Sequence, residues 1–420
     1  MEFEVIGFVA LSLGAYALIS KRLARSPVSG PMLFTAFGLV AVSIIGIERA
    51  DVLTEASTRI MEVTLALVLF TDAMTLHVSS WREDGELPGR LLLIGMPLTI
   101  ALGTIAAAVM YGALGIWEAA ILATLLAPTD AALGKAVVTN PRVPIRIRQA
   151  LNVESGLNDG LALPLLLFFI ALAEAREGAN FFALIAQGIG IGVLAGLVIG
   201  GGGAWLMKVS HRKGWIGRTW RQILVVALAL LAYSAADSFS GSGFIAAFTA
   251  GITFGHFIER DYPKVGDFGE DLAEAMTMIA FMIFGGILLE PSLSQIGTRE
   301  ILFALLALTV IRMVPVAISM IGSKLELRTV GYLGWFGPRG LASIIFGALV
   351  VEQAVVPYTD TIVLVMMTTV GLSIILHGAT AYFGSNNYAN WYDAMQETGE
   401  DMMESIDVAN PRVRRRVERM

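Results

Sequence analysis

The chain has 420 residues and a net charge of −6; 56% of the residues are apolar and only 15% are charged. Soluble proteins carry charge on about a quarter of their residues, so this composition excludes a soluble enzyme, a disordered protein and a nucleic-acid binder. Cysteine is absent, which excludes disulfide scaffolds, thiolate zinc sites and cysteine nucleophiles.

Apolar stretches recur along the chain, most of them long enough for a helix to cross about 30 Å of hydrocarbon. They predict an all-α polytopic membrane protein with thirteen transmembrane helices. The predicted spans are 5–20, 31–47, 60–78, 91–111, 117–137, 151–173, 181–207, 222–238, 243–258, 272–290, 300–322, 330–351 and 359–383. We interpret residues 1–385 as one transmembrane domain and the polar residues 386–420 as a short cytoplasmic tail.

The basic residues predict how the chain is oriented in the membrane. Of the 29 Lys and Arg residues, 23 fall in alternate loops and the C-terminal tail, whereas 4 fall in the loops on the opposite side. Cytoplasmic loops carry the excess of basic residues. The N-terminus is therefore expected outside the cell and the C-terminus in the cytoplasm.

Two predicted spans are interrupted near the middle by residues that do not suit a helix. The fifth contains Ala-Pro-Thr-Asp at 127–130, and the twelfth contains Gly-Pro-Arg-Gly at 337–340. Both can unwind there, because proline removes a helical hydrogen bond and glycine tolerates irregular dihedral angles. An offset of seven spans makes the two helices run in opposite directions, so spans 1–6 and 8–13 are predicted to be inverted repeats. Paired interruptions of this kind indicate the binding site of a secondary transporter; the alternative is two ordinary proline kinks.

Six charged side chains lie well inside the predicted spans. They are Asp72, Asp130, Glu154, Asp159, Arg312 and Arg339. A charge at mid-membrane costs about 2.5–3.5 kcal/mol on insertion scales, so these groups must pair, face water or remain partly protonated. Four of these residues are acids and two are arginines, so at least two of the acids are expected to have no fixed cationic partner. The alternative is a set of structural salt bridges.

The densest polar cluster is Glu-Ser-Gly-Leu-Asn-Asp at 154–159, in the sixth span. On a helix, Ser155 and Asp159 share one face, while Glu154 and Asn158 share the adjacent face. Burial disfavours the charged form of a carboxyl group, so an acid here can exchange a proton near neutral pH or bind a small hard cation, which prefers oxygen ligands. The oxygen atoms available for such a shell belong to Asp72, Thr129, Asp130, Ser155 and Asp159. This pattern favours a site where a cation and a proton compete.

The motifs resemble those of a known group of membrane proteins. Residues 127–130, 154–160 and 337–343 look like the signature stretches of the monovalent cation/proton antiporter superfamily, in its electroneutral branch of prokaryotic NhaP proteins and animal NHE exchangers. The Asn158–Asp159 pair is the most specific part, since electrogenic relatives typically carry two adjacent aspartates there. The resemblance implies a 13-helix fold with broken, crossing helices 5 and 12. It also implies a homodimer, a core domain that moves against a dimerisation domain, and a place in the plasma membrane of a prokaryote.

The resemblance also implies which residues bind the ion. Asp159 would bind Na⁺ or H⁺ in turn, and Ser155 and Thr129 would complete the shell. Asp130 would lie nearby and act through water. Some members place a ligand glutamate in span 3, where this chain has Asp72, one methylene shorter.

Four further residues are implied to hold charge in place. Glu154 would pair with Arg312 of span 11, steadied by Asn158, and Arg339 would serve at the second break as a structural or pH-tuning group. With Asn158 neutral, the mobile site carries the same charge with Na⁺ as with H⁺, which predicts electroneutral one-for-one exchange of Na⁺ or Li⁺ for H⁺ by alternating access.

Other functions remain as alternatives. A K⁺/H⁺ antiporter of the same fold differs in ligand distances, which side-chain identities do not set. A cation channel would need a continuous pore. An organic-anion symporter would be expected to have fewer buried acids. A membrane-embedded metalloenzyme is disfavoured because the sequence contains no His-Glu-x-x-His motif. We expect neither enzyme activity nor a cofactor, and the expected partners are the cation, the proton, the lipid bilayer and a second copy of the chain.

Overall fold

The fold is helical and divides into two compact units. The computed structural model describes residues 2–23, 26–45, 55–75, 86–174, 181–258, 262, 264–352, 356–397 and 402–405, which contain helices and no strand. The first unit is formed by Met1–Thr54, Ser79–Asn158 and Phe281–Met420, and the second by Glu55–Val78 and Asp159–Ala280. Two helices, α10 (Ile145–Glu174) and α14 (Asp267–Ile283), run from one unit into the other.

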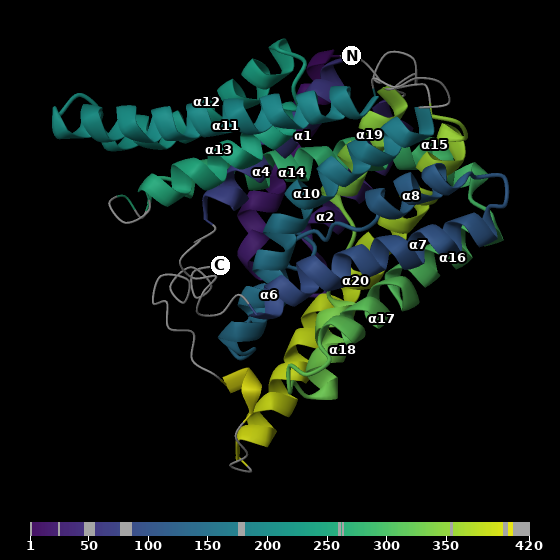
Figure 1. Cartoon of the computed structure of the whole chain (residues 1–420). Helices are drawn as coiled ribbons and strands as arrows, with labels where there is room; N and C mark the ends of the chain where they lie inside the picture. The colour runs from purple at the N-terminus through teal and green to yellow at the C-terminus, as the bar shows by residue number, and fades with distance from the viewer. Residues whose placement is uncertain are drawn as a thin grey trace. The chain divides into compact units, whose positions relative to one another are not determined.

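Figure 1 shows the helices along the chain. Those of the first unit are α1 (Glu2–Leu23), α2 (Gly30–Ile45), α6 (Glu86–Arg90), η1 (Leu91–Gly95), α7 (Met96–Met110), α8 (Ile116–Leu125), α9 (Lys135–Val138), η2 (Phe284–Leu289), α15 (Glu290–Ser292), η3 (Leu293–Gln295), α16 (Thr298–Leu308), α17 (Val310–Ser319), α18 (Leu327–Trp335), α19 (Leu341–Glu352), α20 (Thr359–Glu397) and η4 (Met403–Ser405). Those of the second unit are α4 (Glu55–Met74), α11 (Phe181–Arg212), α12 (Arg218–Ser238) and α13 (Gly243–Ile258).

The helices are those of a multi-pass membrane protein. Within the described residues, eight helical segments are long and apolar enough to cross a membrane, and further apolar helices are shorter. Thirteen crossings and the inverted repeats stay predictions. Several basic residues on which the predicted orientation depends, among them Arg49, Arg82 and Arg176, lie outside the described residues.

Both predicted interruptions are confirmed. The first lies between the end of α8 at Leu125 and the start of α9 at Lys135. The second lies between the end of α18 at Trp335 and the start of α19 at Leu341. Pro128 and Pro338, which lack the N–H group that a helix needs, fall inside these gaps.

Two other helices have bounds that differ from those predicted by the apolar stretches. The predicted span 300–322 is two helices, α16 and α17, which meet at Thr309. Helix α20 does not end with the apolar stretch at 383 but continues to Glu397. It continues because Tyr388 and Ala389 pack one of its faces into the buried core of the first unit.

The second unit is held together by closely packed helices. Helices α11 and α13 lie side by side (Figure 1). Glycines make this approach possible: a Cβ atom on Gly196 would lie 2.7 Å from the carbonyl oxygen of Ala246, and one on Gly200 would lie 2.5 Å from that of Ala250. Atoms this close must move apart, so larger residues would separate the two backbones.

Candidate functional site

Each helix break leaves backbone groups without a partner in their own helix. These are the last carbonyl groups of α8 and the first N–H groups of α19, and at membrane depth they must be satisfied within the protein. The two breaks satisfy each other. The N–H of Asp130 donates to the carbonyl of Pro338 at 2.7 Å. The Ser343 hydroxyl donates to the carbonyl of Leu125, also at 2.7 Å.

Arg339 lies against the carbonyl end of α8, which carries a partial negative charge. Its Nη1 atom donates to the carbonyl of Ala127 and, at 3.1 Å, to that of Pro128. The backbone N–H of Arg339 donates to the hydroxyl of Ser373 on α20 at 2.7 Å. Arg339 is 1% exposed, so its charge compensates the end of α8 from inside the protein.

Asp130 occupies the matching position at the amino-terminal, positive end of α19. Its Oδ2 atom accepts from the N–H of Leu341 at 2.7 Å, and its Oδ1 atom accepts from the N–H groups of Ala132 at 2.7 Å and Leu133 at 3.3 Å. Gly340 allows this approach, because a Cβ atom there would overlap the Asp130 carboxylate. Both carboxylate oxygens thus bind backbone N–H groups, which attract a carboxylate to a helix end. The predicted action of Asp130 on an ion through water stays a prediction.

Glu154 and Arg312 form a buried ion pair. The two guanidinium nitrogens Nη1 and Nη2 of Arg312, on α17, donate to Oε1 and Oε2 of Glu154, on α10, at 2.6 and 2.8 Å. Both side chains are 2% exposed. Bidentate geometry of this kind fixes both side chains. Because their charges are opposite, the buried pair has no net charge.

Oxygen-bearing side chains gather beside the first break. The Ser155 hydroxyl donates to the carbonyl of Thr129 at 2.5 Å, and the Asn158 amide donates to the Thr129 hydroxyl at 2.7 Å. All three residues are buried. We call Thr129, Ser155 and Asn158 the oxygen cluster. The unwound segment places the Thr129 hydroxyl within reach of the Asn158 amide. The predicted role of Asn158 in steadying Glu154 stays a prediction.

Asp159 follows the oxygen cluster on the same helix. Helix α10 is continuous through this segment, so Asp159 stands one turn beyond Ser155 and on the same face. Asp72 lies in α4 and is partly buried. Asp72 and Asp159 both belong to the second unit, whereas the oxygen cluster belongs to the first.

Sequence reasoning missed two residues that complete the crossing. Ser343 binds the end of α8, and Ser373 binds the backbone of Arg339. Ser343 lies within the third signature stretch, so the motif itself was a signal. Ser373 is a serine in an apolar helix, and its sequence neighbours give no sign of its partner.

Comparisons with known proteins show what the chain is similar to. The chain matches the family model described as sodium/hydrogen exchanger, transmembrane, over residues 8–383. It is 24% identical over 419 residues to the K⁺/H⁺ antiporter NhaP of Alkalimonas amylolytica, which covers 96% of this chain and 70% of that protein. It is 24% identical over 386 residues to the K⁺/H⁺ antiporter NhaP2 of Shewanella sp. strain MR-4, covering 90% of this chain and 66% of that one. The chain thus spans about two thirds of the length of these curated relatives.

The fold resembles that of a solved structure. The sodium proton antiporter MjNhaP1 from Methanocaldococcus jannaschii at pH 8 superposes with a TM-score of 0.72 at 20% sequence identity. The superposition covers 90% of this chain and 100% of the other. At this identity the likeness concerns the fold.

Proposed function

Because the chain belongs to the transmembrane sodium/hydrogen exchanger family, within the monovalent cation/proton antiporter superfamily, we propose that it exchanges a monovalent cation for a proton across a membrane. The observation that carries the proposal is the oxygen cluster at the crossing of two broken helices, one turn from Asp159. Unwound backbone and half-helix ends at membrane depth are how secondary transporters build ion sites.

The roles of two buried acids narrow the choice of the exchanging group. Glu154 is held by both terminal nitrogens of Arg312, and the Asp130 carboxylate is bound by three backbone N–H groups. These contacts give Glu154 and Asp130 structural roles at the crossing. Asp159 is favoured as the exchanging group because Ser155 stands one turn away on the same helix face.

In the proposed cycle, Asp159 binds the cation and the proton by turns. The carboxylate, the Ser155 hydroxyl oxygen and an oxygen of Thr129 supply hard ligands for a small cation. The Ser155 proton is directed to the Thr129 carbonyl, so the lone pairs of its oxygen face away from that bond and are available to a cation. Asp130 remains part of the site as a counter-charge, and Asp72 as a further ligand directly or through water. The loaded site then opens to the other side, the cation leaves, and a proton takes its place.

The charge balance around the site supports electroneutral exchange. Asn158 is neutral, and the charges of Glu154 and Arg312 cancel in their ion pair. Arg339 and Asp130 compensate opposite helix ends. We assign the charge that changes to Asp159, and one Na⁺ or one H⁺ neutralises it equally.

We propose Na⁺ or Li⁺ as the transported ion, with K⁺ as the alternative. The name of the solved MjNhaP1 structure specifies sodium, whereas both NhaP relatives are named for K⁺. The choice depends on ligand distances in the loaded site.

The proposal extends to a homodimer with a moving core and a dimerisation domain in a prokaryotic plasma membrane, built from two inverted six-helix repeats. It includes an external N-terminus, a transmembrane domain of residues 1–385 and a short cytoplasmic tail.

Transport in proteoliposomes tests this proposal. The full chain is reconstituted with a pH-sensitive dye inside, a pH gradient is imposed, and Na⁺, Li⁺ and K⁺ are added in turn. At least one ion should dissipate the gradient, and Asp159→Asn should abolish the response. Asp237→Asn is the matched control, because Asp237 is exposed in the last turn of α12 and should transport normally. Exchange that persists in Asp159→Asn contradicts the site, and a rate that follows an imposed membrane voltage contradicts electroneutrality.

A further inference from the structure

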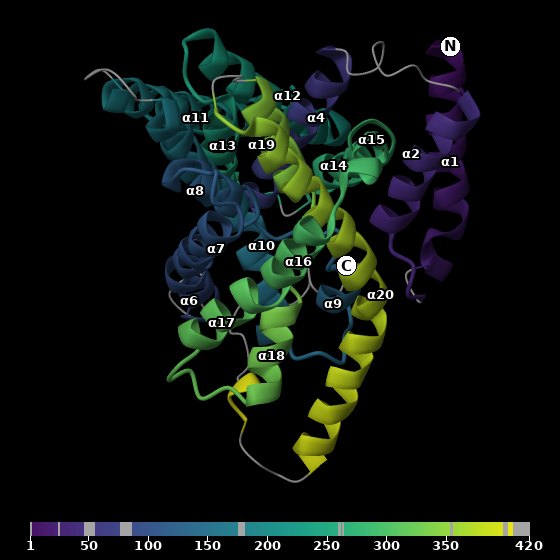
Figure 2. The ribbon, with the colours of Figure 1, turned by 90° about the vertical axis from the view of Figure 1, so that its right-hand side faces the viewer.

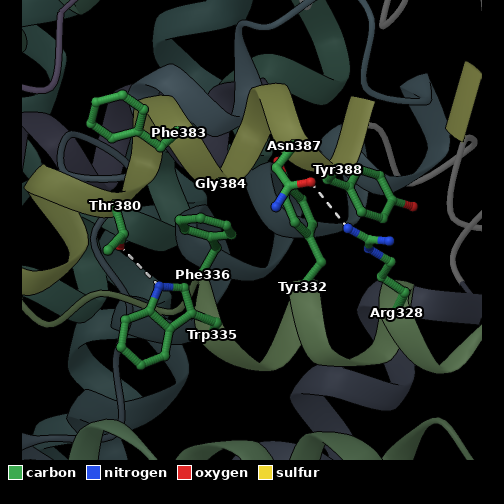
Figure 3. Close-up of a pocket in the computed structure, with 9 residues that line it drawn as sticks. All are labelled: Arg328, Tyr332, Trp335, Phe336, Thr380, Phe383, Gly384, Asn387 and Tyr388. Carbon is green, nitrogen blue, oxygen red and sulfur yellow. Dashed lines mark hydrogen bonds between the residues drawn. The ribbon is translucent and has the colours of Figure 1, made fainter. Parts of the chain in front are cut away.

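A slot lies between α18 and α20, beside the second helix break. The two helices lie side by side (Figure 2), and the cavity between them has a volume of about 340 Å³, within the range of small-molecule sites. The residues that define this α18–α20 slot are Arg328, Tyr332 and Trp335 on α18 and Thr380, Phe383 and Asn387 on α20. Figure 3 shows Trp335 and Thr380, and likewise Arg328 and Asn387, pointing toward each other across the gap, whereas the Phe383 ring projects from α20 on the side away from α18.

Two hydrogen bonds close the ends of the slot (Figure 3). Nη2 of Arg328 donates to Oδ1 of Asn387 at 3.0 Å, and Nε1 of Trp335 donates to the hydroxyl of Thr380 at 3.0 Å. Each link lies seven residues from the other along both helices, which run antiparallel. Seven residues of helix measure about 10 Å, so the α18–α20 slot is a short groove with a polar link at each end.

The slot changes character from one end to the other. Arg328 and Asn387 fall just outside the apolar spans 330–351 and 359–383, whereas the other defining residues fall inside them. Phe336 is 6% exposed and forms part of the buried wall. By the predicted spans, the α18–α20 slot has a cationic rim at the membrane interface and an aromatic interior at hydrocarbon depth.

The positive charge at the rim belongs to Arg328. The neighbouring acid Glu404 accepts from the Thr329 hydroxyl at 2.6 Å and from the N–H of Glu326 at 2.9 Å. Within the described part of the chain, Arg328 forms no ion pair; its guanidinium contacts the Asn387 amide and lies 5.5 Å from the centre of the Trp391 ring. Asp393, the acid nearest along α20, is paired with Arg142 at 2.6 Å. A guanidinium has five N–H donors, so Arg328 keeps donors for an anion.

The face around the slot indicates that its occupant comes from the bilayer. Phe383 is 62% exposed, and Ile375, eight residues earlier on the same helix, is 58% exposed. In a membrane-spanning helix, such side chains meet acyl chains. A ligand that enters along this face therefore has an apolar portion, and the positive charge of Arg328 selects an anionic head.

We propose that the α18–α20 slot binds an anionic phospholipid. Its phosphate would sit on the Arg328 guanidinium, whose planar fork suits phosphate oxygens. The first part of one acyl chain would lie against Phe336 and Phe383. A zwitterionic phospholipid offers the same chain without net charge, so the site distinguishes lipids by their head groups.

Native mass spectrometry of the purified full chain tests this proposal. The protein in detergent is titrated with phosphatidylglycerol or with phosphatidylcholine of identical acyl chains. The wild type should retain the first phosphatidylglycerol molecule more tightly, and Arg328→Gln should weaken that binding about tenfold, the worth of one strong charge-assisted contact. Lys324→Gln is the matched control: it removes an exposed positive charge four residues earlier that does not line the slot, and should change binding less than about twofold.

A second measurement locates the lipid. The fluorescence of Trp335 is obtained as the difference between the wild type and Trp335→Phe. Phosphatidylglycerol with brominated acyl chains should quench this fluorescence, and the quenching should disappear in Arg328→Gln. Equal binding of both lipids, an equal loss in Lys324→Gln, or unchanged Trp335 quenching in Arg328→Gln each overturns the proposal. Displacement of the bound lipid by excess inorganic phosphate does so as well, because it would show a site for the free anion.

Discussion

The crossing of the broken helices and the α11–α13 pair are both buried contacts between membrane helices, yet different forces hold them. At the crossing, Arg339 and Asp130 bind the ends of opposite half-helices, and Glu154 pairs with Arg312. In the α11–α13 pair, glycines such as Gly200 bring two intact backbones into contact. The first contact is built from charges and the second from shape.

The difference follows from the state of the backbone. An intact helix satisfies its own N–H and C=O groups, so helices can associate through close van der Waals packing. A broken helix exposes polar groups that the bilayer cannot satisfy, and charged side chains must meet them. Charge at the crossing is therefore a consequence of unwinding, and unwinding is what provides a place for an ion.

The largest predicted effect is on the ion pair of the crossing. Glu154→Gln leaves the charge of Arg312 buried without a counter-charge, which should destabilise the protein by about 3–5 kcal/mol. Thermal unfolding in detergent measures this. The double variant Glu154→Leu with Arg312→Met removes both charges and should be closer to wild type than Glu154→Gln, since apolar replacement of a buried pair is often neutral. A double variant less stable than the single one would show that the pair does more than cancel charge.

The stability of the α11–α13 contact should depend on the side-chain volume at its glycines. Gly200→Ala places a methyl group against the backbone of Ala250 and should cost about 1–3 kcal/mol, as overpacking does. Gly202→Ala is the control two residues away, because no atom lies within 4 Å of a Cβ atom there. It should be neutral or slightly stabilising through its higher helix propensity. Equal unfolding temperatures for the two variants would contradict the close packing of α11 on α13.

The smallest effect concerns the oxygen cluster. Thr129→Val keeps the shape and the carbonyl but removes the hydroxyl that accepts the Asn158 amide. The lost contact, about 1 kcal/mol, should raise the apparent KM for the cation about fivefold, measured in proteoliposomes. Thr104→Val is the control, since the Thr104 hydroxyl binds the Ile100 carbonyl within α7. An unchanged KM in Thr129→Val would remove the Thr129 hydroxyl from the site.

The sequence predicts the breaks well because proline and glycine act locally. The gap after Leu125 and the gap after Trp335 lie where the Pro and Gly residues are. It does not predict that Asp130 binds the N–H of Leu341, because nothing in the spacing of residues 211 apart fixes their contact. The junction at Thr309 is not predicted either, because no proline or glycine stands next to it in the sequence.

The central claim is that a cation and a proton compete for Asp159. The most direct test is the apparent KM for the transported cation, measured in proteoliposomes over several pH values at a fixed pH difference. Competition predicts that, at acidic pH, this KM rises by up to about tenfold for each unit that the pH falls, while the maximal rate at saturating cation stays constant. An apparent KM that does not change with pH, together with a maximal rate that does, would contradict a shared site.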